Sequence, residues 1–239
     1  NITGFIGPRI ENYYMYITPS IYKPGALKSM KLGGNGVFGA STDVGFGFKF
    51  EADNGFGFAS NIVDKNADAT AGGLLGDDSV RKWDTQVAYT TDNWHLSATL
   101  SDAQNWESQS YNATTLGLLR GSDGTDAAGD TTGYAFRGYW MPEESGTAVP
   151  EISVGYDTMS ADNPASGAGK EADSYFVGLT WKDMFQADDR IGLAFTQPLK
   201  QTECNGTCSS TEVDPFVWEA YYAFKPNDSM EVRPAVFGG

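Results

Sequence analysis

Apolar and polar residues alternate with a period of two over most of the chain, which is the repeat expected of β-strands with two unlike faces. In one stretch, Trp83 and Tyr89 fall on the apolar face, whereas Lys82 and Asp84 fall on the other. Repetition of this pattern predicts about 11 strands of the length that a tilted membrane-spanning strand requires. They cover residues 1–9, 43–51, 56–62, 82–91, 94–101, 134–140, 151–157, 175–182, 190–196, 216–225 and 230–236.

The connections between these strands alternate in length. Those near residues 53, 92, 145, 185 and 227 are short, whereas 10–40, 64–80, 103–131, 159–172 and 199–214 are long and polar. A bacterial outer-membrane barrel has short turns at its periplasmic rim and long loops at its outer rim. A β-sandwich has no reason to separate the two kinds of connection. The pattern therefore predicts an all-β fold, a transmembrane antiparallel up-and-down β-barrel.

Tryptophan placement favours the same fold. Five tryptophans fall on the apolar faces near strand ends: Trp83, Trp94, Trp140, Trp181 and Trp218. Aromatic girdles occupy this level in membrane barrels, at the lipid headgroups. The alternative is a soluble secreted β-sandwich that binds carbohydrate, with these residues in its core or exposed as ligand platforms. The repeated charges on the opposite faces suit a water-filled interior better.

Composition narrows the class further. The chain has 239 residues, 13% of them aromatic, with 29 glycines, which favours strands and tight turns in one domain. No segment approaches the ~18 consecutive apolar residues of a transmembrane helix, so a helical membrane protein is excluded. The net charge of -15 argues against a nucleic-acid partner, which requires a basic patch.

An odd number of strands cannot close a bacterial barrel that has both termini in the periplasm. We therefore expect residues 1–239 to be one outer-membrane barrel domain that is incomplete at both ends, with strands missing from each.

The sequence contains few residues of the types that usually catalyse reactions or bind metal ions. His95 is the single histidine, which leaves no histidine cluster for a metal and allows a conventional Ser-His-Asp triad only around that one residue. We expect no enzyme activity, no metal and no cofactor, and we interpret His95 as a solvated residue of the barrel interior. Cys204 and Cys208 lie in a polar loop, where a surface disulfide is favoured over a metal or redox site.

Charged residues on the inner faces of the predicted strands would set the electric field along a pore. These pore-lining candidates are nearly balanced in sign: Arg9, Lys49, Glu51, Lys82, Asp84, Arg137, Glu151, Asp157, Lys182, Glu219, Lys225, Glu231 and Arg233.

The first long connection is basic and aromatic, unlike the rest of this acidic chain. It carries Tyr13, Tyr14, Tyr16, Tyr22, Lys23, Lys28 and Lys31. Two interpretations remain open. The segment is either an ordinary exposed loop or a constriction loop that folds inward and narrows the pore with positive charge.

Three motifs stand out when the chain is compared with known families. They are Ile6-Gly7-Pro8-Arg9 before the tyrosine-rich stretch, the hairpin from Lys82-Trp83 to Asn93-Trp94, and the terminal pair from Trp218-Glu219-Ala220-Tyr221-Tyr222 through Pro226-Asn227-Asp228 to Phe237. These motifs resemble those of cyanobacterial outer-membrane porins related to the carbohydrate-selective porin family. The resemblance spans nearly the whole chain.

This resemblance implies a porin of the cell outer membrane that passes small solutes and inorganic ions by passive diffusion. It implies a barrel of about 16 strands when complete, assembled as a homotrimer. The partners would be outer-membrane lipid and lipopolysaccharide, and the cell wall would be bound through a surface-layer-homology module that this chain does not contain. Sugar selectivity is not implied, because the residues of an aromatic sugar slide have no assignable counterparts here.

Overall fold

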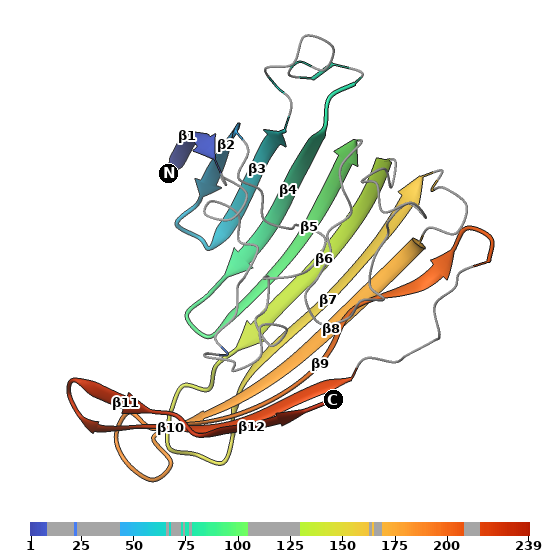
Figure 1. Ribbon diagram of the computed structural model, residues 1–239. Coiled ribbons are helices and arrows are strands. Elements are labelled where there is room, and N and C mark those ends of the chain that lie inside the picture. Colours follow the sequence, from blue (N-terminus) through green and yellow to red (C-terminus); the bar gives the residue numbers. More distant parts are fainter. Residues whose placement is uncertain are drawn as a thin grey trace.

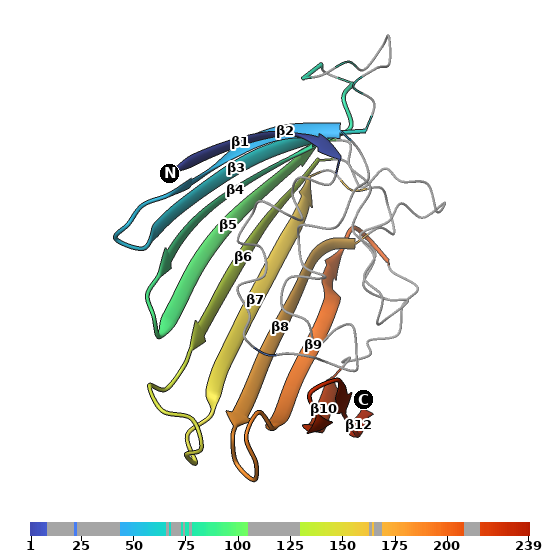
Figure 2. The same ribbon diagram turned by 90° about the vertical axis from the view of Figure 1, so that its left-hand side faces the viewer.

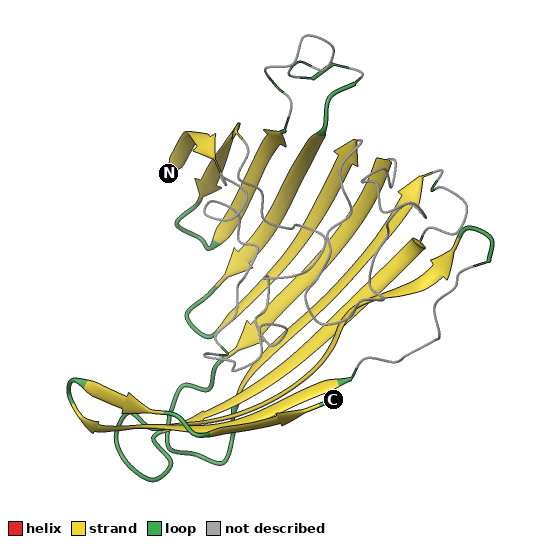
Figure 3. Cartoon of the chain, in the orientation of Figure 1, coloured by secondary structure: helices red, strands yellow, loops and turns green. Residues whose placement is uncertain are grey.

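The computed structural model describes residues 1–8, 22, 44–65, 67, 73, 75–76, 78–104, 130–162, 164, 169–207 and 216–239. Within these residues the chain is all-β, as predicted, and contains no helix (Figure 3). Accordingly, no helix of the described part has the length and apolar character needed to cross a membrane.

Twelve strands of the described chain form one antiparallel sheet (Figure 1). They are β1 (Ile2–Pro8), β2 (Val44–Glu51), β3 (Phe56–Asp64), β4 (Arg81–Thr90), β5 (Trp94–Gln104), β6 (Asp130–Trp140), β7 (Glu151–Asp162), β8 (Gly169–Lys182), β9 (Arg190–Cys204), β10 (Val217–Asn227), β11 (Met230–Val232) and β12 (Ala235–Gly238).

The topology is up-and-down, because each strand from β1 to β11 pairs with the next strand in sequence. The registers run without a shift from β1 to β8, and Ala98 pairs with Val87 on one side and Phe136 on the other. Figure 2 shows that the sheet is strongly curved. Among the described strands, β1 pairs with β2 at one edge of the sheet and β12 pairs with β10 at the other. Because β1 and β12 do not pair with each other, the sheet of the described strands is open.

The two faces of the sheet differ in polarity. The polar face is buried and the apolar face is exposed, the reverse of the arrangement in a soluble protein. We define the polar face as the one that carries Lys82, Asp84 and Gln86, and the apolar face as the one that carries Trp83 and Val87. Side chains of the polar face are buried and those of the apolar face are exposed, so we assign the polar face to the concave side of the curved sheet. The apolar face leaves large side chains exposed: Phe46, Phe48, Phe56, Trp83, Val87, Tyr89, Leu96, Leu100, Tyr134, Phe136, Trp140, Val154, Tyr156, Tyr175 and Trp218.

Tryptophans of the apolar face lie near the ends of the strands, some beside the short connections and others beside the long connections. Trp94, Trp140 and Trp181 are next to the short connections 91–93, 141–150 and 183–189, whereas Trp83 and Trp218 are next to the long connections 65–80 and 205–216. The exposed apolar side chains therefore form a band with tryptophans at each border.

Three of the predicted long connections are shorter in the structure. Residues 159–162 and 169–172 continue β7 and β8, so the expected loop 159–172 was too long at both ends. β9 extends to Cys204, so the expected loop 199–214 began too early. The expected loop 103–131 was also too long, because β5 ends at Gln104 and β6 begins at Asp130. Beyond the apolar band the outward positions carry polar residues such as Ser160, so alternation fades while the backbone ladder continues to Glu171. The alternation of apolar and polar residues therefore ends with the apolar band, whereas the backbone hydrogen bonds between β7 and β8 continue beyond it.

The last predicted strand, 230–236, is divided into β11 and β12, which raises the strand number from about 11 to 12. Pro234 stands at the break and has no backbone N–H to donate to β10. Its carbonyl still accepts a hydrogen bond from the Tyr222 N–H, at 3.1 Å. Both short strands consequently remain paired with β10.

Candidate functional site

The polar face brings the predicted lining charges together as pairs. Lys82 Nζ lies 3.7 Å from Asp84 Oδ2, and both side chains are almost fully buried. Near the short connections, Lys49 pairs with Glu51 at 3.0 Å, and Lys182 pairs with Glu151. The sequence predicted these residues one by one as lining residues, and the structure joins them in pairs of opposite charge. The net charge of these pairs is therefore close to zero.

The strongest of these pairs is between β6 and β7. Both terminal nitrogens of Arg137 contact the carboxylate of Asp157, Nη2 donating to Oδ2 at 2.7 Å. Arg137 Nη1 also donates to the carbonyl of Phe136, at 3.1 Å. A two-point contact between guanidinium and carboxylate fixes direction as well as distance. The guanidinium of Arg137 and the carboxylate of Asp157 are therefore held in a fixed orientation relative to each other.

A second charged group lies around β11. Glu231 accepts hydrogen bonds from Arg190 on β9, at 2.6 Å, and from Arg233. Lys225 pairs with Asp188 at 3.4 Å, in an exposed position. Sequence reasoning missed Arg190 and Asp188, because the pairing of β10 with β9 on one side and with β11 on the other decides their partners.

Asp189 holds the short connection between β8 and β9 in shape. Its carboxylate accepts hydrogen bonds from the backbone N–H groups of Met184, at 2.8 Å, and Phe185, at 3.0 Å. The hydroxyl of Tyr222 on β10 donates to the same carboxylate at 3.0 Å. One buried side chain thus ties this turn to the neighbouring strand.

Several buried polar groups of this face lack a hydrogen-bond partner in the described part of the chain. They include the side-chain atoms of Asn61 and the hydroxyls of Ser97 and Ser153. Buried polar groups without a protein partner are normally satisfied by water. The chemistry of the face therefore suits contact with water.

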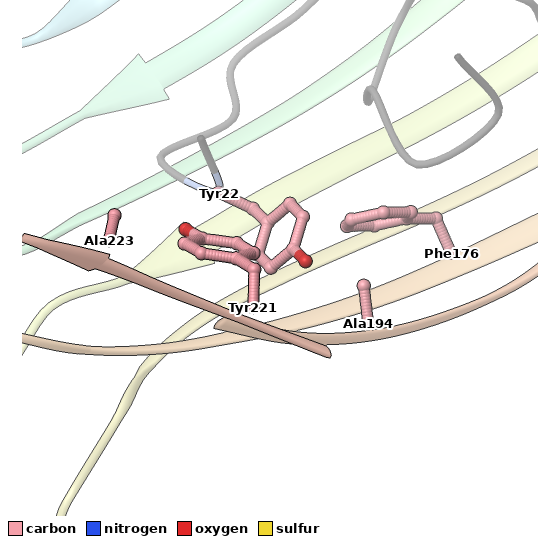
Figure 4. Packing of buried hydrophobic residues seen from close by; sticks show 5 residues of the cluster. All are labelled: Tyr22, Phe176, Ala194, Tyr221 and Ala223. Atoms are coloured by element: carbon pink, nitrogen blue, oxygen red, sulfur yellow. The ribbon is translucent and has the colours of Figure 1, made fainter. Parts of the chain in front are cut away.

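Tyr22, from the connection between β1 and β2, packs on this same face, against strands far along the sheet. It is 3% exposed and forms a cluster with Phe176, Ala194, Tyr221 and Ala223 of β8, β9 and β10 (Figure 4). Its ring meets those of Phe176 and Tyr221 edge to face, with centroids 5.7 Å and 5.8 Å away.

The Tyr22 hydroxyl donates a hydrogen bond to Glu219 Oε1 at 2.9 Å. Burial raises the pKa of this hydroxyl and the charge of Glu219 raises it further, so it stays protonated as the donor. The structure thus joins one residue of the tyrosine-rich segment to a predicted lining residue, a contact that the sequence did not predict.

The remaining constriction-loop candidates lie outside the described residues: Tyr13, Tyr14, Tyr16, Lys23, Lys28 and Lys31. The lining candidate Arg9 lies outside them as well. Cys204 is disulfide-bonded, but Cys208 is not among the described residues, so the expected pairing of the two stays a prediction.

His95 differs from the expectation of a solvated residue. It lies on the polar face, but it is 2% exposed, stacks on Tyr139 at 5.4 Å and has Nδ1 at 2.7 Å from Thr90 Oγ1. Within the described ranges, no group of three or more His, Cys, Asp or Glu side chains is arranged to hold a metal ion.

These features define a class of structure, a curved antiparallel sheet with ion pairs on its buried face and apolar side chains on its exposed face. The chain matches no protein-family model, and no curated protein shows significant similarity to it. A function must therefore be argued from this geometry.

Proposed function

We propose that this chain forms the wall of a porin, a water-filled channel for passive diffusion of small solutes and inorganic ions across an outer membrane. The observation that carries the proposal is the reversed polarity of the sheet. Ion pairs and hydroxyls occupy the buried concave face, whereas apolar side chains cover the opposite face. Interior water and exterior lipid are the two solvents that satisfy these faces together.

The energetics of the apolar face support lipid as its surroundings. Val87 is 45% exposed and Leu96 is 59% exposed, and more than a dozen large apolar side chains share their face. Moving a half-exposed side chain of this kind from water into hydrocarbon gains roughly 1 kcal/mol. Monomeric soluble proteins rarely expose an apolar patch of this extent. A soluble sandwich would need a second sheet over this face, and the described strands form a single sheet.

A channel in lipid also requires a closed barrel. Edge strands present a row of unpaired backbone groups, and each such group costs several kcal/mol in hydrocarbon. The proposal therefore includes further strands that pair with the open edges of β1 and β12. A complete barrel of about 16 strands, as the resemblance to cyanobacterial porins implies, would meet this requirement.

The wider assignment comes from that resemblance. It comprises membership of the cyanobacterial porin family, a homotrimer in the cell outer membrane, contact with lipopolysaccharide, and attachment to the cell wall through a separate module. The alternating lengths of the connections and the tryptophans at both borders of the apolar band are consistent with this assignment.

Liposome swelling tests the proposed function directly. Vesicles that contain the purified protein should swell in isotonic sugar solutions, faster for small sugars than for large ones, and empty vesicles should not. Solubility without detergent, together with failure to insert into vesicles, would favour the carbohydrate-binding sandwich instead.

A further inference from the structure

The apolar face is hollowed along β5, β6 and β7, three neighbouring strands in the middle of the sheet (Figure 1). One hollow of about 650 Å³ reaches Ala98. A second hollow of about 350 Å³ reaches Trp94 and Trp140. Leu96 and Gly138 border both hollows. The two hollows therefore adjoin, and we call them together the apolar groove.

Small residues on adjacent strands form the floor of the apolar groove. Gly138 on β6 pairs with Leu96 on one side and Val154 on the other, and Ala98 pairs with Phe136. A Cβ atom on Gly138 would lie 3.0 Å from Leu96 Cδ2 and 3.7 Å from Val154 Cγ2. Leu96 and Phe136 are 59% and 51% exposed and form walls beside this floor. A glycine within a strand often marks a place where a ligand approaches the backbone closely.

The apolar groove runs from one border of the apolar band toward its middle. Trp94 and Trp140 lie opposite each other at the end next to the short connections, and Ala98 is four residues from Trp94 on β5. Four residues of a strand cover roughly 13 Å, or about 10 Å along the membrane normal when the strand is tilted by roughly 40°. One leaflet of a bilayer contributes roughly 15 Å of hydrocarbon. The groove therefore follows about two thirds of the length of a lipid chain.

The two ends of the apolar groove differ as the two ends of a lipid chain do. Tryptophans favour the level at which headgroups meet chains, so Trp94 and Trp140 mark the place where a chain begins. From there the groove leads into the middle of the apolar band. A lipid chain follows this direction in a bilayer, whereas the surface of a second protein copy has no reason to do so.

Charge favours recognition of the chain and not of the headgroup. The outward side chains that border the apolar groove are uncharged, and the guanidinium of Arg137, which also borders it, is held by Asp157. Asp92 and Glu143, in the short connections beside Trp94 and Trp140, are exposed and acidic. These carboxylates repel an anionic headgroup. Apolar contact with the chain is therefore the interaction that the groove offers.

We propose that the apolar groove binds one acyl chain of a membrane lipid, which enters between Trp94 and Trp140 and passes over Gly138 toward Ala98. The inference rests on the assignment of the apolar face to lipid in the proposed porin. A chain in the groove contacts protein below and on both sides, whereas a chain elsewhere on the face contacts protein on one side. The lipid in the groove should therefore be retained when other lipids are removed.

Two substitutions change the groove while keeping the surface apolar. Ala98→Phe fills its inner end, and Leu96→Ala removes one of its walls. Ala220→Phe is the matched control for the added ring. Ala220 shares the apolar face with Trp218 on β10 but lies outside the groove. Folding of every variant is checked first by heat-modifiable migration on a gel.

Native mass spectrometry of the detergent-extracted protein, titrated with dipalmitoylphosphatidylcholine, measures retention of the lipid. The parent and Ala220→Phe should keep one lipid per chain at collision energies that remove the others, and Ala98→Phe and Leu96→Ala should lose it. Dipalmitoylphosphatidylglycerol should bind no more tightly, because the groove recognises the chain. Equal retention in the parent and in both groove variants would overturn the inference. An oligomer that dissociates in Ala98→Phe, with no lipid bound to the parent, would assign the groove to a second copy of the chain.

Photo-cross-linking in vesicles tests the direction of the chain. A phosphatidylcholine with a diazirine near the glycerol end of its chain should label peptides that contain Trp94 or Trp140. A diazirine near the methyl end should label the region around Ala98. Labelling spread evenly over the apolar face of a conducting protein would overturn the groove and leave the porin function intact. Preferential labelling in an inserted protein that forms no channel would end the porin function and retain the lipid site.

Discussion

Placing a charge in the middle of the apolar face perturbs the surface that contacts lipid in the proposed porin. Val87 pairs with Ala98 on β5, and Ala98 lies midway between Trp94 and Asp102 on that strand. At about 3.3 Å per residue, each of these ends is roughly 13 Å away along the strand. A strand tilt of roughly 40° reduces this to about 10 Å along the membrane normal, so Val87 lies near the centre of an apolar band about 25 Å tall.

Val87→Arg should therefore destabilise the folded state in lipid by about 2–4 kcal/mol, the cost of an arginine at the bilayer midplane. This corresponds to a folding equilibrium that is roughly 30- to 700-fold less favourable. The measurement is a denaturant titration of reversible folding into lipid vesicles. Val87→Leu, which keeps the position apolar, should change the free energy of unfolding by less than about 1.5 kcal/mol.

Ser160→Arg is the matched charged control. Ser160 shares the outward direction of the apolar face, since it pairs with Thr132 on β6, but it lies beyond the apolar band. The same arginine there should cost about 0–1 kcal/mol. Equal losses for Val87→Arg and Ser160→Arg would contradict the assignment of the apolar face to lipid, because depth in a bilayer would then have no effect. Gln86 is less suitable as a control, since it is fully buried and donates to Thr99 at 2.8 Å.

Asp157→Ala should cost about 3–5 kcal/mol in a urea titration, because Arg137 is left as an uncompensated buried charge, and the Arg137→Met, Asp157→Leu double variant should recover most of that loss. Burial acts to raise the pKa of Asp189, but hydrogen bonds from the backbone of its turn outweigh this and lower it. Its stabilising effect should be present above the unfolded pKa of about 4 and disappear as the pH falls through the lowered value, and Asp189→Asn should abolish this dependence in hydrogen exchange of the turn. Glutamate at Lys23, Lys28 and Lys31 should shift the reversal potential in a salt gradient toward cation preference, whereas an unchanged potential would place these lysines outside the ion pathway.

The strands could be predicted from the sequence wherever their two faces meet different surroundings. β4 spans Arg81–Thr90 and the alternation predicted 82–91, because Trp83 and Lys82 belong to faces of opposite polarity. At Ser160 the contrast between the faces is lost, while the backbone pairing continues to Glu171. Alternation in the sequence reflects the contrast between the two faces and not the hydrogen bonds between strands. The predicted strand 151–157 therefore ended too early, since β7 continues to Asp162.

The contacts of the candidate site depend on register, which the sequence leaves open. Asp157 lies directly opposite Ala135, two residues before Arg137 on β6. Arg137 therefore reaches the carboxylate of Asp157 diagonally across the two strands. Individual charges on the polar face were predictable from alternation, but their partners were not. The contacts of Tyr22 with Phe176 and Tyr221 were not predicted either, because nothing in the sequence relates the segment after β1 to strands so much later in the chain.

Single-channel recording in a planar lipid bilayer determines whether this protein forms a water-filled pore. The purified protein, extracted in detergent and added at nanomolar concentration, should produce discrete conductance steps that scale with salt concentration, as expected of a water-filled pore. Heat-denatured protein at the same concentration provides the control and should produce none. Folded, bilayer-inserted protein that gives no conductance steps would contradict the assignment of the concave polar face to a diffusion channel.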